Sequence, residues 1–233
     1  MSTAQRIIKY FAIGFAAFLS FTIISAIAFG ALGILSATKL IKNNSSVEIR
    51  CEENESPCLQ IALGASELII KKGETFSAES TYGHVEIKQD GDKMVITEKD
   101  GSVFDDYNRT TTVYVPEDMV FYKAGISGGA GRIYIESLNA KELEIALGVG
   151  ETAIDNLEFE SAKIDAGIGR VSVKLASDES KYAIKANKGI GEIKFNGSSI
   201  GGDTWIGSGN NKIEISGGIG SIIINTAEKK VEE

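Results

Sequence analysis

Four residues near position 105 have the side chains that acid–base chemistry requires. Asp105, Asp106, Tyr107 and Arg109 lie close together in one polar stretch. Paired carboxylates can supply a proton donor and an acceptor, as in enzymes that cleave polysaccharides. The single histidine, His84, excludes most mechanisms that use a Ser-His-Asp triad. A solvated loop explains the same residues, so catalysis is kept as an alternative hypothesis.

Residues 199–211 combine glycines with oxygen-bearing side chains, as calcium-binding repeats do. Asp203 is the only carboxylate among them, and Asn210 and Asn211 offer weaker carbonyl ligands. A solvated glycine turn therefore explains the segment better than a calcium site does. Trp205, the only tryptophan, is interpreted as a cap over the last coils. The alternative is an exposed platform on which a sugar ring stacks.

Cys51 and Cys58 are the only cysteines, and they bracket an acidic segment that contains a proline. A disulfide between them would close a short loop at the start of the folded domain, which is typical of proteins outside the cytosol. Two free thiols, or half of a zinc site, are the alternatives. Zinc requires four ligands and the chain has one histidine, so the metal interpretation is weak.

A short repeat positions the rest of the chain. Two apolar residues at alternate positions precede a Gly-x-Gly unit, and two more follow it, which is the pattern of strands with one buried face on either side of a corner. The first glycines lie 19, 19, 22, 18 and 11 residues apart, from Gly129 to Gly218 with Gly207 included. The corner glycines of the copies are Gly129, Gly131, Gly148, Gly150, Gly167, Gly169, Gly189, Gly191, Gly218 and Gly220.

This period of about 20 residues predicts an all-β fold, a β-solenoid of stacked coils similar to a β-helix or β-roll. Glycine suits each corner because it accepts positive φ and close backbone approach, and Gly167 is expected to need positive φ. The short last step predicts a cap near Gly218. A β-sandwich whose hairpins carry glycines is the alternative. A dinucleotide site is disfavoured because a strand follows each glycine pair where that motif needs a helix.

The repeat also extends toward the N-terminus in a weaker form. Gly64 to Ser66 and Thr81 to Gly83 are flanked by alternating apolar residues like those of the later copies. Between these and Gly129, the Asp-Gly dipeptide in the segment 89–93 predicts a tight hairpin.

A long apolar segment precedes the repeats. Residues 11–35 contain no charged side chain, and as a helix they would span roughly 37 Å, more than the ~30 Å hydrocarbon core of a bilayer. This predicts a transmembrane helix over residues 10–37. A cleaved signal peptide is the alternative, because Ala26-Ile27-Ala28 resembles a cleavage site, but the apolar run is longer than the usual ~7 to 15 residues.

Charge bears on partners and on orientation. The chain carries a net charge of −8, and residues 1–42 hold four basic and no acidic side chains, so the remainder carries −12. So acidic a domain disfavours binding to nucleic acid. Basic residues flank both ends of the apolar segment, so the positive-inside rule nearly ties. The free amino group beside Arg6, with the acidic composition and cysteine usage of the long domain, favours a cytoplasmic N-terminus and a domain outside the cell membrane. Small residues four apart in the helix, such as Ala12 and Ala16, allow a homodimer through it.

These boundaries divide the chain into consecutive parts. They are a tail (1–9), the transmembrane helix (10–37), a linker (38–46), divergent β coils (47–122), Gly-x-Gly repeats (123–226) and a charged tail (227–233).

The order of these features resembles the putative-adhesin β-strand-repeat family. The order is an N-terminal anchor, a β-rich start, a strand ending in Val113-Tyr114-Val115-Pro116-Glu117, and successive Gly-x-Gly coils. That family is similar to the toastrack-type domains of bacterial envelope-stress proteins. The resemblance covers about residues 47–225 and implies fold and envelope location. It brings no catalytic residues, and no cofactor is expected.

Together these features predict a membrane-anchored, extracytoplasmic β-solenoid that acts as a non-catalytic adhesion, binding or scaffold module. Its partner would be an unknown envelope polymer or protein. The first alternative is an envelope-stress sensor that signals through a membrane partner, and the second is a carbohydrate-active enzyme that uses Asp105 and Asp106.

Overall fold

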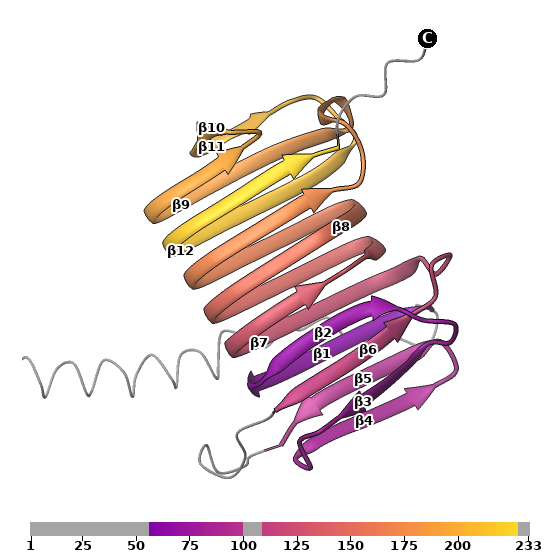
Figure 1. The fold of residues 1–233 in the computed structure, drawn as a ribbon. Coiled ribbons are helices and arrows are strands. Elements are labelled where there is room, and N and C mark those ends of the chain that lie inside the picture. The colour runs from indigo at the N-terminus through magenta and orange to yellow at the C-terminus, as the bar shows by residue number, and fades with distance from the viewer. Residues whose placement is uncertain (1–55, 100–108, 228–233) are drawn as a thin grey trace, which may run out of the picture. The chain divides into compact units, whose positions relative to one another are not determined.

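The computed structural model describes residues 56–99 and 109–227 (Figure 1). All of them belong to the second of two compact units, residues 44–233. They are almost entirely strand, which confirms the all-β prediction. The strands are β1 (Cys58–Ala65), β2 (Glu67–Lys72), β3 (Ser77–Ser80), β4 (Val85–Asp90), β5 (Lys93–Glu98), β6 (Thr110–Val115), β7 (Phe121–Ile135), β8 (Leu138–Leu175), β9 (Tyr182–Phe195), β10 (Ser198–Ile200), β11 (Gly202–Ile206) and β12 (Asn211–Thr226).

We use the word rung for one passage of the chain through both arms of a corner. The strands β7, β9 and β12 are single rungs, whereas β8 contains two, residues 138–156 and 157–175. Neighbouring rungs pair in parallel and in register, so that Ile126 lies beside Ile145 and Ile164 beside Ile215. The ribbons of the rungs lie side by side (Figure 1). Because the rungs repeat the same alternation, their buried side chains form one continuous core.

The order of the rungs differs from their order in the sequence. The sequence predicts a cap near Gly218, but β12, which contains this glycine, lies between the second rung of β8 and β9, and it pairs in parallel with both. At the other end, β5 and β6 pair in parallel with β1 and β2 and separate them from β3 and β4. Thus, at each end of the stack, a strand from later in the sequence lies between strands that come earlier in it.

Both ends of the stack finish in short antiparallel strands. The strands β3 and β4 run antiparallel to β6 and β5, and β10 and β11 run antiparallel to β9. Short outer strands limit the edge available for pairing with another chain. The turn between β4 and β5 holds Gly91 at φ +56°, which confirms the hairpin predicted for the segment 89–93.

The predicted transmembrane helix, residues 10–37, lies outside the described residues. Within the described part of the chain, no helix has the length and apolar character needed to cross a bilayer. The corner predicted at Gly64 to Ser66 joins β1 to β2. The pair Gly207 and Gly209, in contrast, lies between β11 and β12 and forms no corner of a rung.

Candidate binding surface

The corner of each rung is shaped by two glycines with different constraints. The second glycine takes a left-handed φ, for example +141° at Gly169, and a Cβ there would lie 1.8 Å from the carbonyl oxygen of Gly150. The first glycine has no left-handed φ, so the expectation for Gly167 is wrong. Its constraint is close approach instead, because a Cβ at Gly167 would lie 2.2 Å from the oxygen of Gly148.

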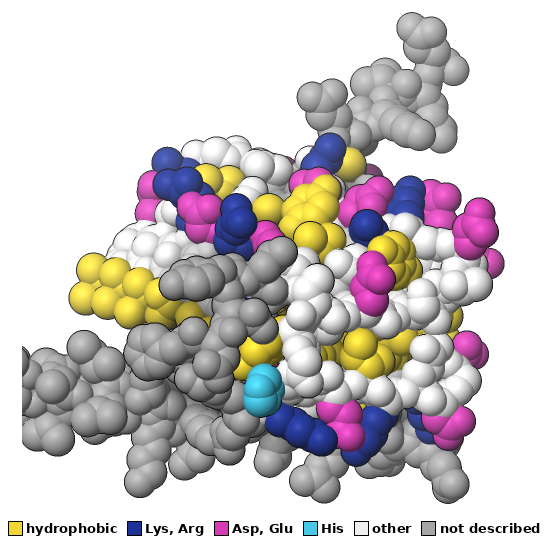
Figure 2. All heavy atoms as spheres, turned by 60° about the horizontal axis from the view of Figure 1, so that its bottom comes forward, with side chains coloured by type: hydrophobic (Ala, Val, Ile, Leu, Met, Phe, Trp, Pro, Cys, Tyr) yellow, Lys and Arg dark blue, Asp and Glu magenta, His cyan; other side chains and the backbone are white. Residues whose placement is uncertain are grey.

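The residue between the two glycines points outward at the apex of the corner. Because the rungs are in register, these side chains form one row, which we call the apolar ridge. Figure 2 shows a continuous band of exposed hydrophobic side chains at the left of the molecule, along this edge. The exposed fractions reach 45% at Val149 and 74% at Ile190. In stack order the apolar ridge consists of Ala130, Val149, Ile168, Ile219 and Ile190.

Charged side chains of both signs flank the apolar ridge on the side of the second glycine. The carboxylate of Glu67 lies 3.2 Å from the guanidinium of Arg132, and the carboxylate of Glu151 lies 3.7 Å from that of Arg170. The row continues through Ser221 to Glu192 in the next two rungs. These pairs are exposed, so they contribute little stability. They place alternating charges beside the ridge.

A second alternating row lies on the arm before the corner. Glu214 is in register with Lys163 on one side and with Lys185 on the other, and Lys163 lies 3.9 Å from Glu144. The hydrogen bond between the Lys163 ammonium and Asp165 raises the pKa of Lys163 above its ordinary value, and the neighbouring carboxylates add to this. This arm therefore presents lysine and glutamate in alternation.

The space behind the ridge is narrow. A cavity of about 40 Å³ lies inside the corner, lined by glycines and by apolar residues such as Leu147 and Val171. Small-molecule sites usually enclose about 300–1,000 Å³. The cavity is therefore too small to enclose an organic ligand, and a partner would contact this corner through its outer surface.

Comparison with solved structures finds this fold in another protein. A putative cell adhesion protein from Clostridium sporogenes ATCC 15579 matches with a TM-score of 0.54 and 18% sequence identity, over 76% of this chain and 96% of that chain. This confirms, at the level of the fold, the resemblance noted from the sequence. A putative adhesin from Bacteroides fragilis NCTC 9343 matches with a TM-score of 0.34 and 11% identity, over 71% of this chain and 91% of that one. No protein-family model and no curated protein matches the chain.

Of the predicted catalytic cluster, only Arg109 lies within the described residues; Asp105, Asp106 and Tyr107 lie outside them. The guanidinium of Arg109 lies 3.9 Å from the Glu98 carboxylate, and both side chains are about nine-tenths buried. The same guanidinium lies 4.2 Å from the centre of the Tyr82 ring.

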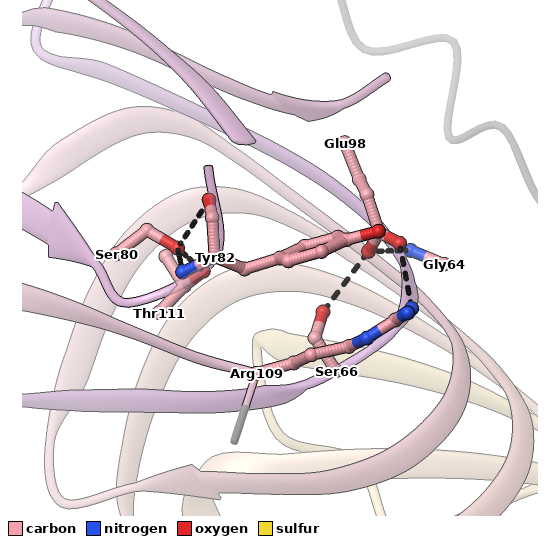
Figure 3. A network of polar contacts seen from close by, with 7 residues as sticks. All are labelled: Gly64, Ser66, Ser80, Tyr82, Glu98, Arg109 and Thr111. Carbon is pink, nitrogen blue, oxygen red and sulfur yellow. Dashed lines mark hydrogen bonds and ion pairs between the residues drawn. The ribbon is translucent and has the colours of Figure 1, made fainter. Parts of the chain in front are cut away.

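Figure 3 shows how the Glu98 carboxylate binds this first corner. It accepts a hydrogen bond of 2.7 Å from the backbone N–H of Gly64 and one of 3.0 Å from the Ser66 hydroxyl. Both of these hydrogen bonds come from the corner that joins β1 to β2. We therefore interpret this group of residues as structural support for the corner.

The segment 199–211 forms part of the end of the stack. Trp205 lies on β11 and is 43% exposed, with the Lys212 ammonium 6.0 Å from its ring centre. The side chain of Asp203 is not among those described. In the described part of the chain, no three His, Cys, Asp or Glu side chains lie close enough to hold a metal ion.

Cys58 begins β1, is fully buried and takes part in a disulfide. Its predicted partner, Cys51, lies outside the described residues, so the pairing stays a prediction.

Sequence reasoning singled out the glycines of each corner but not the residue between them. The signal was present, because that residue is aliphatic in each complete copy of the repeat, for example Val149, Ile168 and Ile219. The sequence alone indicates no role for this residue, because the direction of its side chain depends on the corner geometry.

Proposed function

We propose that this chain is a non-catalytic binding module of the cell envelope, a β-solenoid held to the membrane by residues 10–37. The observation that carries the proposal is the apolar ridge. Exposed apolar side chains scattered singly need no explanation, but a continuous row of them marks a surface that meets a partner. The ridge is produced by the repeat itself, so its length follows the number of rungs.

Three further observations support the proposal. The parallel, in-register rungs and their stacked glycine corners are the features of a β-solenoid. The protein of similar fold from Clostridium sporogenes carries the name of a cell adhesion protein, which points to the same class of function. The apolar segment 11–35 supplies the anchor, and the acidic composition that follows it suits a domain outside the cell membrane.

Binding is tested with the full-length chain in detergent or nanodiscs, incubated with fractions of the cell envelope. The double substitution Ile168→Ser with Ile219→Ser removes the centre of the apolar ridge, and retention is expected to fall several-fold. Val120→Ser is the matched control, because Val120 is 42% exposed and lies outside the ridge. Equal retention of both variants contradicts the proposal. A stoichiometric membrane partner that binds independently of the ridge supports the sensor alternative.

Topology is tested with a thiol reagent that does not cross membranes. Asn210 is exposed, so Asn210→Cys places a single free thiol at the end of the stack while Cys51 and Cys58 stay unchanged. We expect labelling of intact cells. Labelling only after lysis would place the domain in the cytosol.

A further inference from the structure

We propose that the partner of the apolar ridge is the lipid bilayer itself, and that the ridge inserts its aliphatic side chains into the interfacial layer of a zwitterionic membrane. This inference deepens the proposed function and depends on it, because it requires the domain to be anchored beside a membrane. It names the partner of the same surface.

The chemistry of the ridge suits a fluid apolar phase. Its members are all aliphatic, and the larger ones, such as Ile190 and Val149, are about half exposed or more. They stand at the apex of the corner, with only a cavity of about 40 Å³ behind them. A protruding row of this kind enters the headgroup and acyl boundary to a depth of about 5–10 Å without needing a complementary pocket.

The charges beside the ridge suit zwitterionic headgroups. Arg132 and Arg170 alternate with Glu151 along the flanking row, so both the phosphate and the ammonium of such a headgroup meet an opposite charge. The −12 carried by the chain after residue 42 opposes binding to an anionic surface. The ridge is therefore matched to a neutral membrane.

The length of chain before β1 places the ridge within reach of the bilayer. The predicted anchor ends at residue 37 and β1 begins at Cys58, and this connection of about 20 residues spans at most about 70 Å when extended. A tethered surface meets its partner at a high effective concentration, so weak affinity is sufficient for contact. A weak affinity of the five ridge side chains for the bilayer is therefore enough to keep them in contact with it.

A second copy of the chain fits the ridge less well. A stable protein–protein interface buries about 800 Å² on each partner, more than a single row of five partly exposed aliphatic side chains provides. The acidic domains of two copies would also repel each other. Self-association is therefore treated as one of the outcomes of the test.

The test uses the full-length chain, because the proposal requires the predicted anchor. The chain contains a single tryptophan, Trp205, which can be replaced. In a Trp205→Phe background, Ile190→Trp places the only fluorophore on the ridge, and Tyr122→Trp places it at a control site that is 38% exposed and away from the ridge. Each protein is reconstituted into phosphatidylcholine vesicles with and without brominated acyl chains. We expect the emission of the ridge tryptophan to fall by about half with brominated lipid, because insertion reaches about 5–10 Å, and the control emission to stay nearly unchanged. Vesicles that contain phosphatidylglycerol should give weaker quenching.

Quenching confined to the ridge supports the inference. Absence of quenching at the ridge, or equal quenching at both sites, overturns it, and so does a blue shift that depends on protein concentration and occurs without quenching. Val149→Trp serves as a second ridge position, with circular dichroism to check the fold of each variant. If the ridge tryptophan is not quenched but the protein still binds wall polymer through the ridge, the inference fails while the proposed function stands.

Discussion

The corners of the middle rungs and the corner at Gly64 solve one steric problem in two ways. In the middle rungs, backbone packs on backbone, and a Cβ added at Gly150 would lie 1.8 Å from the oxygen of Gly131. At the first corner the neighbour is a side chain, and a Cβ added at Gly64 would lie 3.1 Å from a carboxylate oxygen of Glu98. The middle corners therefore require glycine. The first corner instead requires a hydrogen-bond acceptor for the backbone N–H of Gly64.

This difference shows how the stack is both extended and ended. A corner made of backbone alone accepts another corner of the same kind on top of it, so the ridge grows with each copy. Glu98 occupies the place of a further glycine corner and satisfies the backbone N–H of Gly64. The apolar ridge is accordingly a property of the repeated part, and the polar corner marks its limit.

The largest effect is expected at a middle corner. Gly169→Ala introduces both a strained φ and a clash with the backbone of the neighbouring rung, and it should lower the free energy of unfolding by more than about 3 kcal/mol. Two control glycines have open space around them. Gly91→Ala, at φ +56°, should cost about 1 kcal/mol from backbone strain alone, and Gly83→Ala should cost still less.

Urea unfolding of the three variants measures these differences. A cost at Gly169 no larger than that at Gly91 would show that the rungs separate easily at the corner. The backbone packing of the middle rungs would then not be the constraint that distinguishes them from the first corner.

The next largest effect is expected at the first corner. Glu98→Ala removes an ion pair in a site that is about nine-tenths buried, together with the acceptor of the hydrogen bonds from Gly64 and Ser66, and should cost about 3 kcal/mol. Glu86→Ala is the control, because the Glu86 carboxylate has exposed lysine partners. Thermal unfolding checks the difference. If the two variants unfold alike, the polar network does not hold the first corner.

The sequence predicts the rungs better than it predicts their order. Period-2 alternation around the glycines identifies the buried residues of each rung, because one face of every strand must enter the core. The position of β12 between β8 and β9 could not be derived from the sequence, because the two rows of charged residues favour different orders of the rungs. Direct contact of β8 with β9 would place Lys163 against Lys185, which is unfavourable, but would also place Arg170 against Glu192, which is favourable.

The first corner was hidden for another reason. Glu98 lies 34 residues from the backbone N–H that it binds. Alternation with Met94 and Ile96 places it on the buried face of its strand, but the sequence does not show which group it meets there. Long-range pairing of this kind has no local signal. The sequence places Arg109 close to Asp105 and Asp106, which lie outside the described residues, and the structure adds a contact with Glu98 that the sequence does not indicate.

A smaller effect is expected from the alternating charges of the middle rungs. Glu214→Lys places three lysines in successive rungs and should lower stability by about 1 kcal/mol at low salt, since like charges directly opposite repel. Glu214→Gln removes the attraction without adding repulsion and is the matched control. Unfolding in low and high salt should show the gap between the variants closing as the charges are screened. If the stability difference between the two variants does not change with salt, it arises from side-chain packing and not from charge repulsion.

The smallest effect is expected at the far end of the stack, where the Ser199 hydroxyl donates a hydrogen bond of 2.6 Å to Glu192. This bond, with the ammonium of Lys194, holds the pKa of the Glu192 carboxyl below its ordinary value. A lowered folded-state pKa adds stability above the ordinary value of 4.5, and that stability is lost as the pH falls through the folded-state pKa. Ser199→Ala should therefore lower the melting temperature slightly at pH 7, and the difference should shrink at pH 3. Ser198→Ala, one position away on β10, is the control. A deficit for Ser199→Ala that stays constant with pH would mean that the hydroxyl acts by packing, and that this end of the stack does not depend on the charge of Glu192.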